Sequence, residues 1–319
     1  MFLLFPYTCL FTFFLFLSTV MIISSPNWLM AWLSMELNLL SFIPMMMSSK
    51  SLRELESTTK YFFAQSLGSI LILLSAFSAF PGASNLTLLG LLLKLGLAPL
   101  HFWFPATMTG ISWEMCMLIS TWQKFPILAL LSLLSPSHQT LFLITSGLSV
   151  MVAGIMGLNQ TQLRTLLAYS SIAHTGWVMA LMSLSSSASW IYFCIYVMIT
   201  LSTMMFLKES NALFFWSTNH APFLLLLLFL SLSGLPPFSG FAIKLGAISL
   251  LSTISIPFTI LMILGSLLSL YFYLSLSFNF LFRSFYPLMK TLNTTFAPSL
   301  LISLSLFSFL LTSNLFLFY

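Results

Sequence analysis

Runs of about twenty apolar residues recur along nearly all of the 319-residue chain, and they constrain its fold more than any other feature. The hydrocarbon core of a membrane is about 30 Å thick, a distance that an α-helix crosses in roughly 20 residues. The chain carries 10 Lys and Arg, 5 acidic residues and no Asp, so only 5% of it is charged. Soluble domains carry about 25% charged residues. The sequence therefore predicts an all-α polytopic membrane protein.

Eleven transmembrane helices are predicted where such runs are bounded by polar, Gly or Pro positions. The predicted spans are 2–23, 28–47, 59–80, 86–104, 113–134, 140–158, 165–184, 188–207, 222–251, 257–281 and 298–318. The first run lacks a basic flank and a cleavage site, so we expect a retained helix rather than a signal peptide. Since no polar segment is long enough for a soluble domain, 1–319 is interpreted as a single membrane domain.

Two predicted spans combine a lysine with helix-breaking residues. Lys94 is followed by Gly96 and Pro99, and Lys244 is preceded by Gly234 and Pro236. Proline removes a backbone donor, so each span is expected to be an interrupted helix, tolerated in a membrane only where protein or water satisfies the backbone. Interrupted helices five spans apart suggest two five-helix inverted repeats, as in transporters. The predicted halves are 1–135 and 140–282, with 298–318 as an additional C-terminal helix.

The distribution of basic residues predicts the orientation of the chain. Loops on the inner side of a membrane are enriched in Lys and Arg. With eleven spans, the loops after odd-numbered helices contain no Lys or Arg. The loops after even-numbered helices contain six, namely Lys50, Arg53, Arg164, Lys208, Arg283 and Lys290. The N-terminus is therefore predicted inside and the C-terminus outside. Because the basic residues form no continuous stripe, nucleic acid is not an expected partner.

Four ionisable residues lie well inside predicted spans, namely Glu36, Lys94, Lys124 and Lys244. A charge at the centre of a membrane helix is unfavourable by about 2.5 to 3.5 kcal/mol, so these side chains should face protein or water. Structural ion pairs or lysines that reach the interface remain an alternative. One carboxylate cannot neutralise three lysines, however, and desolvation disfavours the charged amine whereas a nearby carboxylate favours it. The excess of buried lysine therefore favours a role in proton handling.

Three further residues are weaker candidates for the same path. His101 would share a helix face with Lys94 if the helix continued through Pro99, and it could relay protons or simply be a core histidine. His174 has polar neighbours at helical spacing and could line a hydrated path. Lys60 lies two residues inside its predicted helix, where it is expected to extend to the interface.

The sequence offers no site for a metal or cofactor that we can identify. Cys9, Cys116 and Cys194 are isolated, and there is no paired His and Cys spacing and no glycine-rich phosphate loop. Any redox centre is therefore expected in a partner protein.

Several motifs in chain order resemble one known family. They are Met35-Glu-Leu-Asn38, Thr59-Lys-Tyr-Phe-Phe-Ala-Gln65, Lys94-Leu-Gly-Leu-Ala-Pro-Leu-His101, Thr121-Trp-Gln-Lys124, Tyr169-Ser-Ser-Ile-Ala-His174 and Ser233-Gly-Leu-Pro-Pro-Phe-Ser-Gly-Phe241. The chain is similar to the antiporter-like membrane-arm subunits of respiratory complex I, the NADH:ubiquinone oxidoreductase, of the mitochondrially encoded animal type. The resemblance implies eleven helices, a pair formed by Glu36 and Lys94, a connecting Lys124, and Lys244 at the far end of the polar axis. The second half offers no acid that corresponds to Glu36.

The resemblance also implies a function. Protons would cross the mitochondrial inner membrane along Lys94, His101 with water, Lys124 and Lys244, driven by NADH oxidation and ubiquinone reduction in other subunits. Flavin, iron-sulfur clusters and ubiquinone would be held by those subunits, with no cofactor in this chain. The expected partners are neighbouring antiporter-like and small membrane subunits and phospholipids. The N-terminus would face the matrix and the C-terminus the intermembrane space.

Two other functions remain open from the sequence. A structural subunit of the membrane arm would use its buried charges only to hold helices in register, so charge-removing variants would lose assembly and pumping together. A stand-alone cation/proton antiporter would share the interrupted helices. It usually needs a carboxylate for its cation, and Glu36 is the only well-buried candidate.

Overall fold

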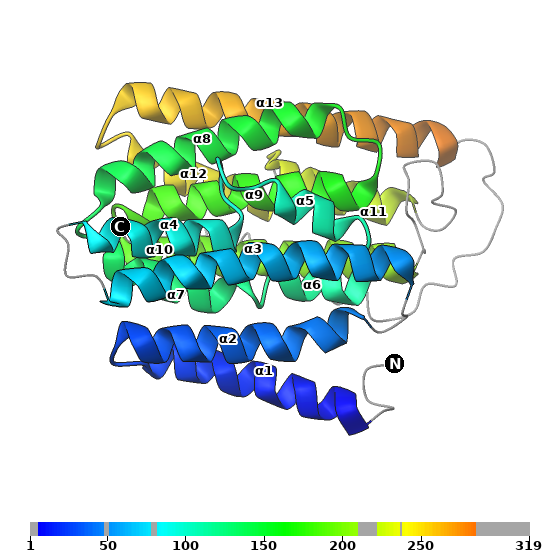
Figure 1. Ribbon diagram of the computed structural model, residues 1–319. Helices are drawn as coiled ribbons and strands as arrows, with labels where there is room; N and C mark the ends of the chain where they lie inside the picture. The colour runs from blue at the N-terminus through cyan, green and yellow to red at the C-terminus, as the bar shows by residue number, and fades with distance from the viewer. Residues whose placement is uncertain (1–5, 48–50, 78–81, 210–221, 237, 285–319) are drawn as a thin grey trace. The chain divides into compact units, whose positions relative to one another are not determined.

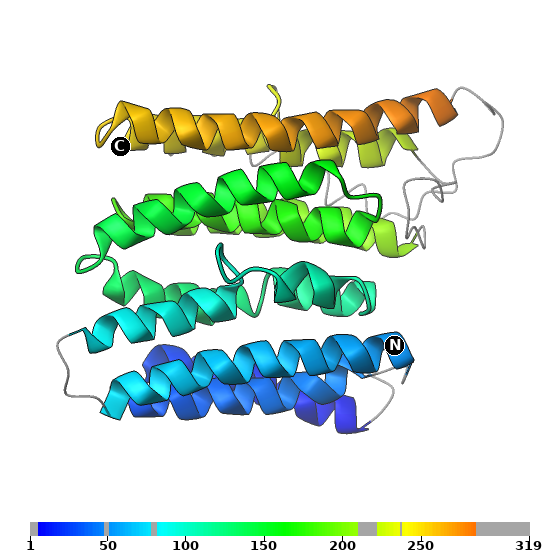
Figure 2. The ribbon, with the colours of Figure 1, turned by 45° about the horizontal axis from the view of Figure 1, so that its top comes forward.

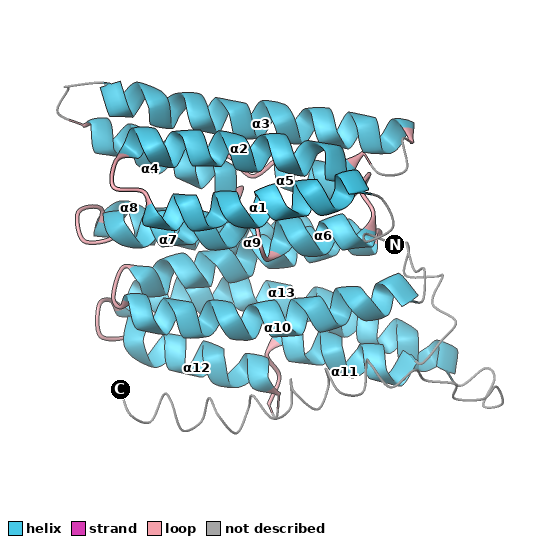
Figure 3. Cartoon of the chain, turned by 90° about the horizontal axis from the view of Figure 1, so that it is seen from below, coloured by secondary structure: helices cyan, strands magenta, loops and turns pink. Residues whose placement is uncertain are grey.

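The computed structural model describes residues 6–47, 51–77, 82–209, 222–236 and 238–284, and all regular structure among them is helical (Figures 1 and 3). In chain order the helices are α1 (Pro6–Ser24), α2 (Trp28–Met46), α3 (Leu52–Phe77), α4 (Ala83–Leu95), α5 (Trp103–Met108), α6 (Trp113–Ser120), α7 (Lys124–Leu134), α8 (Gln139–Leu158), α9 (Leu163–Met182), α10 (Ser186–Glu209), α11 (Pro222–Ser233), α12 (Ser239–Leu251) and α13 (Ile256–Ser284). The predicted all-α fold is confirmed.

Six stretches of the described residues are long and apolar enough to cross a membrane. They are Trp28–Met46, Leu52–Phe77, Trp113–Leu134, Gln139–Leu158, Ser186–Glu209 and Ile256–Phe278. Shorter apolar helices cover Thr8–Ser24, Ala83–Leu95 and Ser239–Leu251. The chain is thus a multi-pass membrane protein. The number of eleven spans stays a prediction, and the predicted span 298–318 lies outside the described residues.

The chain divides into two compact units, Met1–His138 and Gln139–Tyr319. In the first unit α1 packs on α2, α2 on α3, and α3 on α4 and α5, while α7 contacts α1 and α4 (Figure 2). Helices α3 and α4 approach closely through glycines, since a methyl group on Gly90 would lie 2.7 Å from the carbonyl oxygen of Gly68. Small residues at such contacts are typical of membrane helix packing.

The second unit is built around α9. This helix contacts α8, α10, α12 and α13, and all but two of its 20 residues are buried. A helix buried on every face lies in the interior of its unit. Here the buried faces also carry polar residues, including Ser170, Ser171, His174 and Thr175. The interior of this unit is therefore not purely apolar. Whether the two units are related as inverted repeats stays a prediction.

The two predicted helix interruptions are confirmed, and they share one local geometry. Helix α4 ends before Gly96 and α11 before Gly234, and both glycines adopt positive φ, 69° and 79°. At each end the two amides that follow bond back to the last turn: Gly96 to Leu93 and Leu97 to Leu92 in the first, Gly234 to Ser231 and Leu235 to Leu230 in the second. These paired bonds are Schellman motifs, for which glycine at positive φ is favoured.

A third interruption was not predicted. The expected continuous span 113–134 is two helices, α6 and α7, separated at Thr121, Trp122 and Gln123. Pro126 lies in the first turn of α7, where the amide it lacks would have no helical partner. The interruption places Lys124 at the first position of α7.

Two predicted helix boundaries were wrong. The fourth span ends at Leu95 rather than at 104, so His101 lies in a connection and does not share a helix face with Lys94. The third helix begins at Leu52 rather than at 59, which places Lys60 eight residues inside it. Lys, Arg and Glu are good helix formers, so polar residues extend the helix that they were expected to flank.

For the same reason, basic residues assigned to inner loops lie within the ends of helices. They are Arg53, Arg164, Lys208 and Arg283.

Candidate functional site

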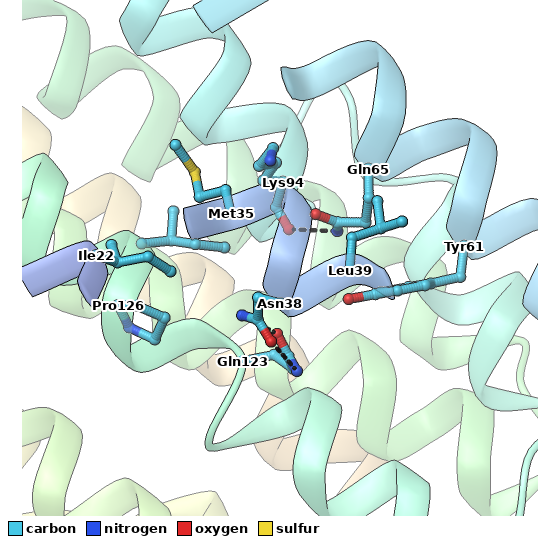
Figure 4. A pocket seen from close by; sticks show the side chains of 10 residues that line it. Ile22, Met35, Asn38, Leu39, Tyr61, Gln65, Lys94, Gln123 and Pro126 are labelled. Carbon is cyan, nitrogen blue, oxygen red and sulfur yellow. Dashed lines mark hydrogen bonds between the residues drawn. The ribbon is translucent and has the colours of Figure 1, made fainter. Parts of the chain in front are cut away.

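Two adjoining cavities lie inside the first unit, and Figure 4 shows the side chains that line the first of them. The first, here called the Lys94 cavity, leaves about 20 Å³ of space that water can occupy. It is lined by Ile22, Met35, Asn38, Leu39, Tyr61, Gln65, Lys94, Gln123, Pro126 and Ile127. The second, here called the Lys124 cavity, leaves about 10 Å³ of such space. It is lined by Tyr61, Gln65, Lys94, Leu95, Trp103, Phe104, Ile119, Gln123, Lys124 and Ile127. Five shared residues make the two cavities neighbours: Tyr61, Gln65, Lys94, Gln123 and Ile127.

Lys94 lines both cavities and is 4% exposed. It lies in the last turn of α4, where a cation is favoured by the helix dipole. The carbonyl groups of this turn have donors from outside the helix: Gln65 Nε2 donates to the Lys94 carbonyl at 3.1 Å, and Trp103 Nε1 donates to the Leu93 carbonyl at 2.9 Å. The interrupted end of α4 is thus held by side chains of α3 and α5.

Glu36 is half-buried on α2 and lies near enough to Lys94 for an electrostatic interaction. No direct ion pair or hydrogen bond joins these two side chains in the described part of the chain. Glu36 is also not among the residues that line the two cavities. The carboxylate is therefore a nearby charge whose effect on Lys94 depends on their separation.

Lys124 is the most deeply buried of the lysines that the structure describes, at 2% exposed. It begins α7, and its Nζ lies 4.8 Å from the centre of the Phe104 ring. The electron-rich face of an aromatic ring attracts a cation, so Phe104 can stabilise a charged Lys124 without taking its proton. Phe104 belongs to α5, which follows the interruption after Lys94. The two lysines thus line one cavity from separate helix breaks.

Asn38 and Gln123 form a reciprocal amide pair beside these lysines (Figure 4). Asn38 Nδ2 donates to Gln123 Oε1 at 2.9 Å, and Gln123 Nε2 donates to Asn38 Oδ1 at 3.1 Å. The pair joins α2 to the break that precedes α7, and both side chains are buried. Sequence reasoning missed these two residues as functional candidates. Their adjacency to buried ionisable residues within apolar spans was the available signal.

His101 is buried in the connection between α4 and α5, at 2% exposed. Its ring lies 4.3 Å from that of Phe102, centre to centre, and it is not a lining residue of either cavity. Lys60 is exposed on α3 and pairs with Glu56 one turn away, with 2.6 Å between Nζ and Oε1. The structure therefore does not bring Lys60 to the site.

Lys244 occupies a comparable break in the second unit. It is 8% exposed on α12, and its Nζ donates to the carbonyl of Ser233 at 2.7 Å. Ser233 is the last residue of α11, so the ammonium group caps the negative end of a helix dipole. Lys94 and Lys244 each lie at an interrupted helix with a Schellman end, but Lys94 precedes its glycine and Lys244 follows its own.

His174 joins a buried aromatic group in the second unit. Its Nδ1 lies 3.0 Å from the hydroxyl of Tyr192, and its ring centre lies 5.1 Å from that of Tyr196. The three residues come from α9 and α10. Neighbouring buried polar side chains on α9 include Ser170 and Ser171. The expected polar surroundings of His174 are thus present.

Among the described residues, no group of three or more His, Cys, Asp or Glu side chains could hold a metal ion. Cys9 and Cys194 are exposed and Cys116 is buried, and all three are free thiols.

Interrupted membrane helices with buried lysines beside internal cavities define an antiporter-like membrane subunit, and the family comparison agrees. A model described as NADH:quinone oxidoreductase/Mrp antiporter, transmembrane, matches residues 25–88 and 78–269. Proteins named NADH-ubiquinone oxidoreductase chain 2 are 42% identical over 281 residues in Lumbricus terrestris and 43% identical over 287 residues in Myxine glutinosa. These alignments cover 82% and 83% of this chain, and 83% and 82% of the relatives. The chain belongs to the NADH-ubiquinone oxidoreductase chain 2 family.

Solved structures share the fold. A chain of respiratory complex I from Thermus thermophilus superposes with a TM-score of 0.82 at 24% identity, covering 95% of this chain and 77% of that one. A chain of a membrane-bound sulfane sulfur reductase, an archaeal respiratory membrane complex, gives a TM-score of 0.86 at 17% identity, covering 98% and 75%.

Proposed function

We propose that this chain is a membrane-arm subunit of respiratory complex I that carries protons across the membrane. Family membership supports the assignment to that complex. The observation that carries the proton-handling role is the pair of adjoining cavities that Lys94 and Lys124 line inside the first unit. Buried amines beside small cavities with polar walls are suited to binding and releasing protons, because burial destabilises their charged form.

In the proposed mechanism, Glu36 sets the protonation of Lys94. A carboxylate near the amine favours the ammonium form, and moving the carboxylate away favours proton release. Coupling from the rest of the complex would change this separation. A released proton would pass through water in the two cavities to Lys124, whose charged form Phe104 stabilises. His101 is a candidate relay near the start of this path.

The second unit would continue the path at Lys244. Its ammonium group lies at a helix terminus whose carbonyl favours the charged form, so proton loss there would weaken the bond to Ser233. His174 with Tyr192 is a candidate hydrated branch, whereas Lys60 has no part in the proposed path. The units would be five-helix inverted repeats within an eleven-helix subunit.

The oxidation of NADH and the reduction of ubiquinone would take place in partner subunits. Those subunits would hold the flavin, the iron-sulfur clusters and the quinone, and this chain would act enzymatically only as part of the translocating complex. We place it in the mitochondrial inner membrane beside other antiporter-like and small membrane subunits, in contact with phospholipids. Its N-terminus would face the matrix and its C-terminus the intermembrane space. Nucleic acid is not a proposed partner.

Native electrophoresis of mildly solubilised inner membranes tests the assignment to a complex. An in-gel stain for NADH dehydrogenase activity marks the complex, and peptide mass spectrometry of the stained band identifies its chains. We expect this chain in the active band. Finding it only at low mass would favour a stand-alone cation/proton antiporter instead.

The structural-subunit alternative is separated from pumping by variants of the buried lysines. If the charges only hold helices in register, Lys94→Met and Lys124→Met complexes lose assembly and proton transport in proportion. If the lysines carry protons, the variants enter the active band at normal abundance and transport fewer protons for each electron pair.

A further inference from the structure

The Asn38 and Gln123 amide pair lies where the two cavities meet. Gln123 lines both cavities, and Asn38 lines only the Lys94 cavity. Gln123 directly precedes Lys124, and Asn38 lies two residues after Glu36 on α2. The pair therefore links the helix that carries the carboxylate to the break that carries the second lysine.

The geometry of the pair indicates a specific junction rather than general polarity. A side-chain amide can make up to four hydrogen bonds. In this pair, Asn38 and Gln123 each donate one hydrogen bond to the other and accept one from it. Each amide therefore has one N–H and one lone pair that these two bonds do not use. An amide neither binds nor releases a proton near neutral pH, so it can orient water but cannot itself store the transferred proton.

We propose that Asn38 and Gln123 are positioning residues that control proton transfer between Lys94 and Lys124. The reciprocal bonds hold the break before α7 against α2, which fixes the position of Lys124 relative to the Lys94 cavity. The remaining amide donor and acceptor positions align water at the junction of the cavities. A shift of α2 that alters the distance from Glu36 to Lys94 would also displace Gln123 through its bonds to Asn38. The change at Lys94 and the change beside Lys124 would therefore be coupled through α2. This inference rests on the proposed function.

The swapped pair tests whether the amides themselves are needed. Asparagine is one methylene shorter than glutamine, so Asn38→Gln with Gln123→Asn keeps the combined length and both reciprocal bonds. Asn38→Leu with Gln123→Met fills similar space without polar groups, and removing both partners together leaves no unsatisfied amide. A purely structural pair would tolerate the apolar replacement at least as well as the swap.

The measurement is the number of protons transported per electron pair by the assembled complex in sealed vesicles. We expect the apolar pair to assemble and oxidise NADH but to lose as many transported protons as Lys94→Met, and the swapped pair to keep the normal number. Gln139→Leu, at an exposed glutamine, is the matched control and should be normal. A normal proton number in the apolar pair, while Lys94→Met is impaired, would overturn this inference alone. A normal number in Lys94→Met would instead contradict the proposed function.

A second comparison applies if the apolar pair does not assemble. Gln123→Asn alone keeps the polarity but is too short to reach Asn38 with both bonds. We expect it to reduce proton transport, and the added change Asn38→Gln to restore it. Failure of the second change to restore transport would overturn the inference.

Discussion

The ammonium group of Lys244 donates a 2.7 Å hydrogen bond to the main-chain carbonyl of Ser233 across the break between α11 and α12. A carbonyl at a helix end has no intrahelical donor, so within a membrane it needs a partner from elsewhere in the protein. Lysine supplies that partner and a favourable charge at once. In the proposed mechanism, the same side chain would serve both the structure of this break and proton handling.

Lys244→Met is expected to destabilise the second unit as well as to impair transport. Hydrogen bonds to charged groups contribute about 1.5 to 3 kcal/mol, so the midpoint of thermal inactivation of the complex should fall. Lys244→Arg keeps a donor and a charge, so it should lower this midpoint less than Lys244→Met does. Lys60→Met removes an exposed ion pair that solvent screens, so it should change the midpoint little, and it serves as the control. Equal midpoints for Lys244→Met and Lys60→Met would contradict a capping role.

Gly90→Ala is expected to disturb the contact between α3 and α4. The added methyl group would lie 2.7 Å from the Gly68 carbonyl oxygen, a backbone atom that cannot rotate away. The helices must separate, which would move Lys94 from its position beside Gly68. We expect reduced assembly in native gels, whereas Ser66→Ala on α3 should assemble normally. Normal assembly and transport by Gly90→Ala would show that the close contact is not required.

Gln65 and Trp103 both donate hydrogen bonds to carbonyl groups at the end of α4, and we expect them to contribute unequally to stability. Trp103→Phe removes the bond to the Leu93 carbonyl, but that carbonyl also accepts from the Gly96 amide. Gln65→Leu removes the donor to the Lys94 carbonyl and a polar wall of both cavities. We expect Gln65→Leu to cost about 1 to 3 kcal/mol and Trp103→Phe less. The midpoints of thermal inactivation of the two variants compare these losses. A larger loss in Trp103→Phe than in Gln65→Leu would be inconsistent with these hydrogen bonds.

Tyr192→Phe should weaken the environment of His174. The substitution removes the hydroxyl that lies 3.0 Å from Nδ1 and leaves a buried ring nitrogen without that partner. The expected loss is about 1 to 3 kcal/mol, visible as a lower midpoint of thermal inactivation. Tyr271→Phe changes an exposed tyrosine and should have no effect. If Tyr192→Phe matched this control, the contact would have no energetic role.

The sequence predicted the fold because its strongest signals are local. Apolar length predicted the membrane helices, and Gly96 and Gly234 with nearby prolines predicted two interruptions that the structure confirms. Proline alone is a weaker signal, since Pro44 lies inside α2 without ending it. Pro126 marks the first turn of α7, and taking it as a helix start would have predicted the third interruption.

Contacts between distant residues could not be predicted in this way. Asn38 and Gln123 are 85 positions apart, and only packing of α2 against the following helices brings their amides together. The early start of α3 at Leu52 was likewise not predicted, and it places Lys60 inside the helix, exposed beside Glu56. The predicted roles of Glu36, Lys94, Lys124 and Lys244 stay predictions, although all three lysines are buried at helix breaks.

The most direct test of the central claim is the number of protons transported per electron pair by complexes that carry Lys94→Met. The matched control is Lys60→Met, which replaces an exposed lysine of the same unit. We expect Lys94→Met complexes to assemble, to oxidise NADH and to transport fewer protons per electron pair, whereas the control should be normal. Normal transport by fully assembled Lys94→Met complexes would contradict the assignment of Lys94 to the proton path.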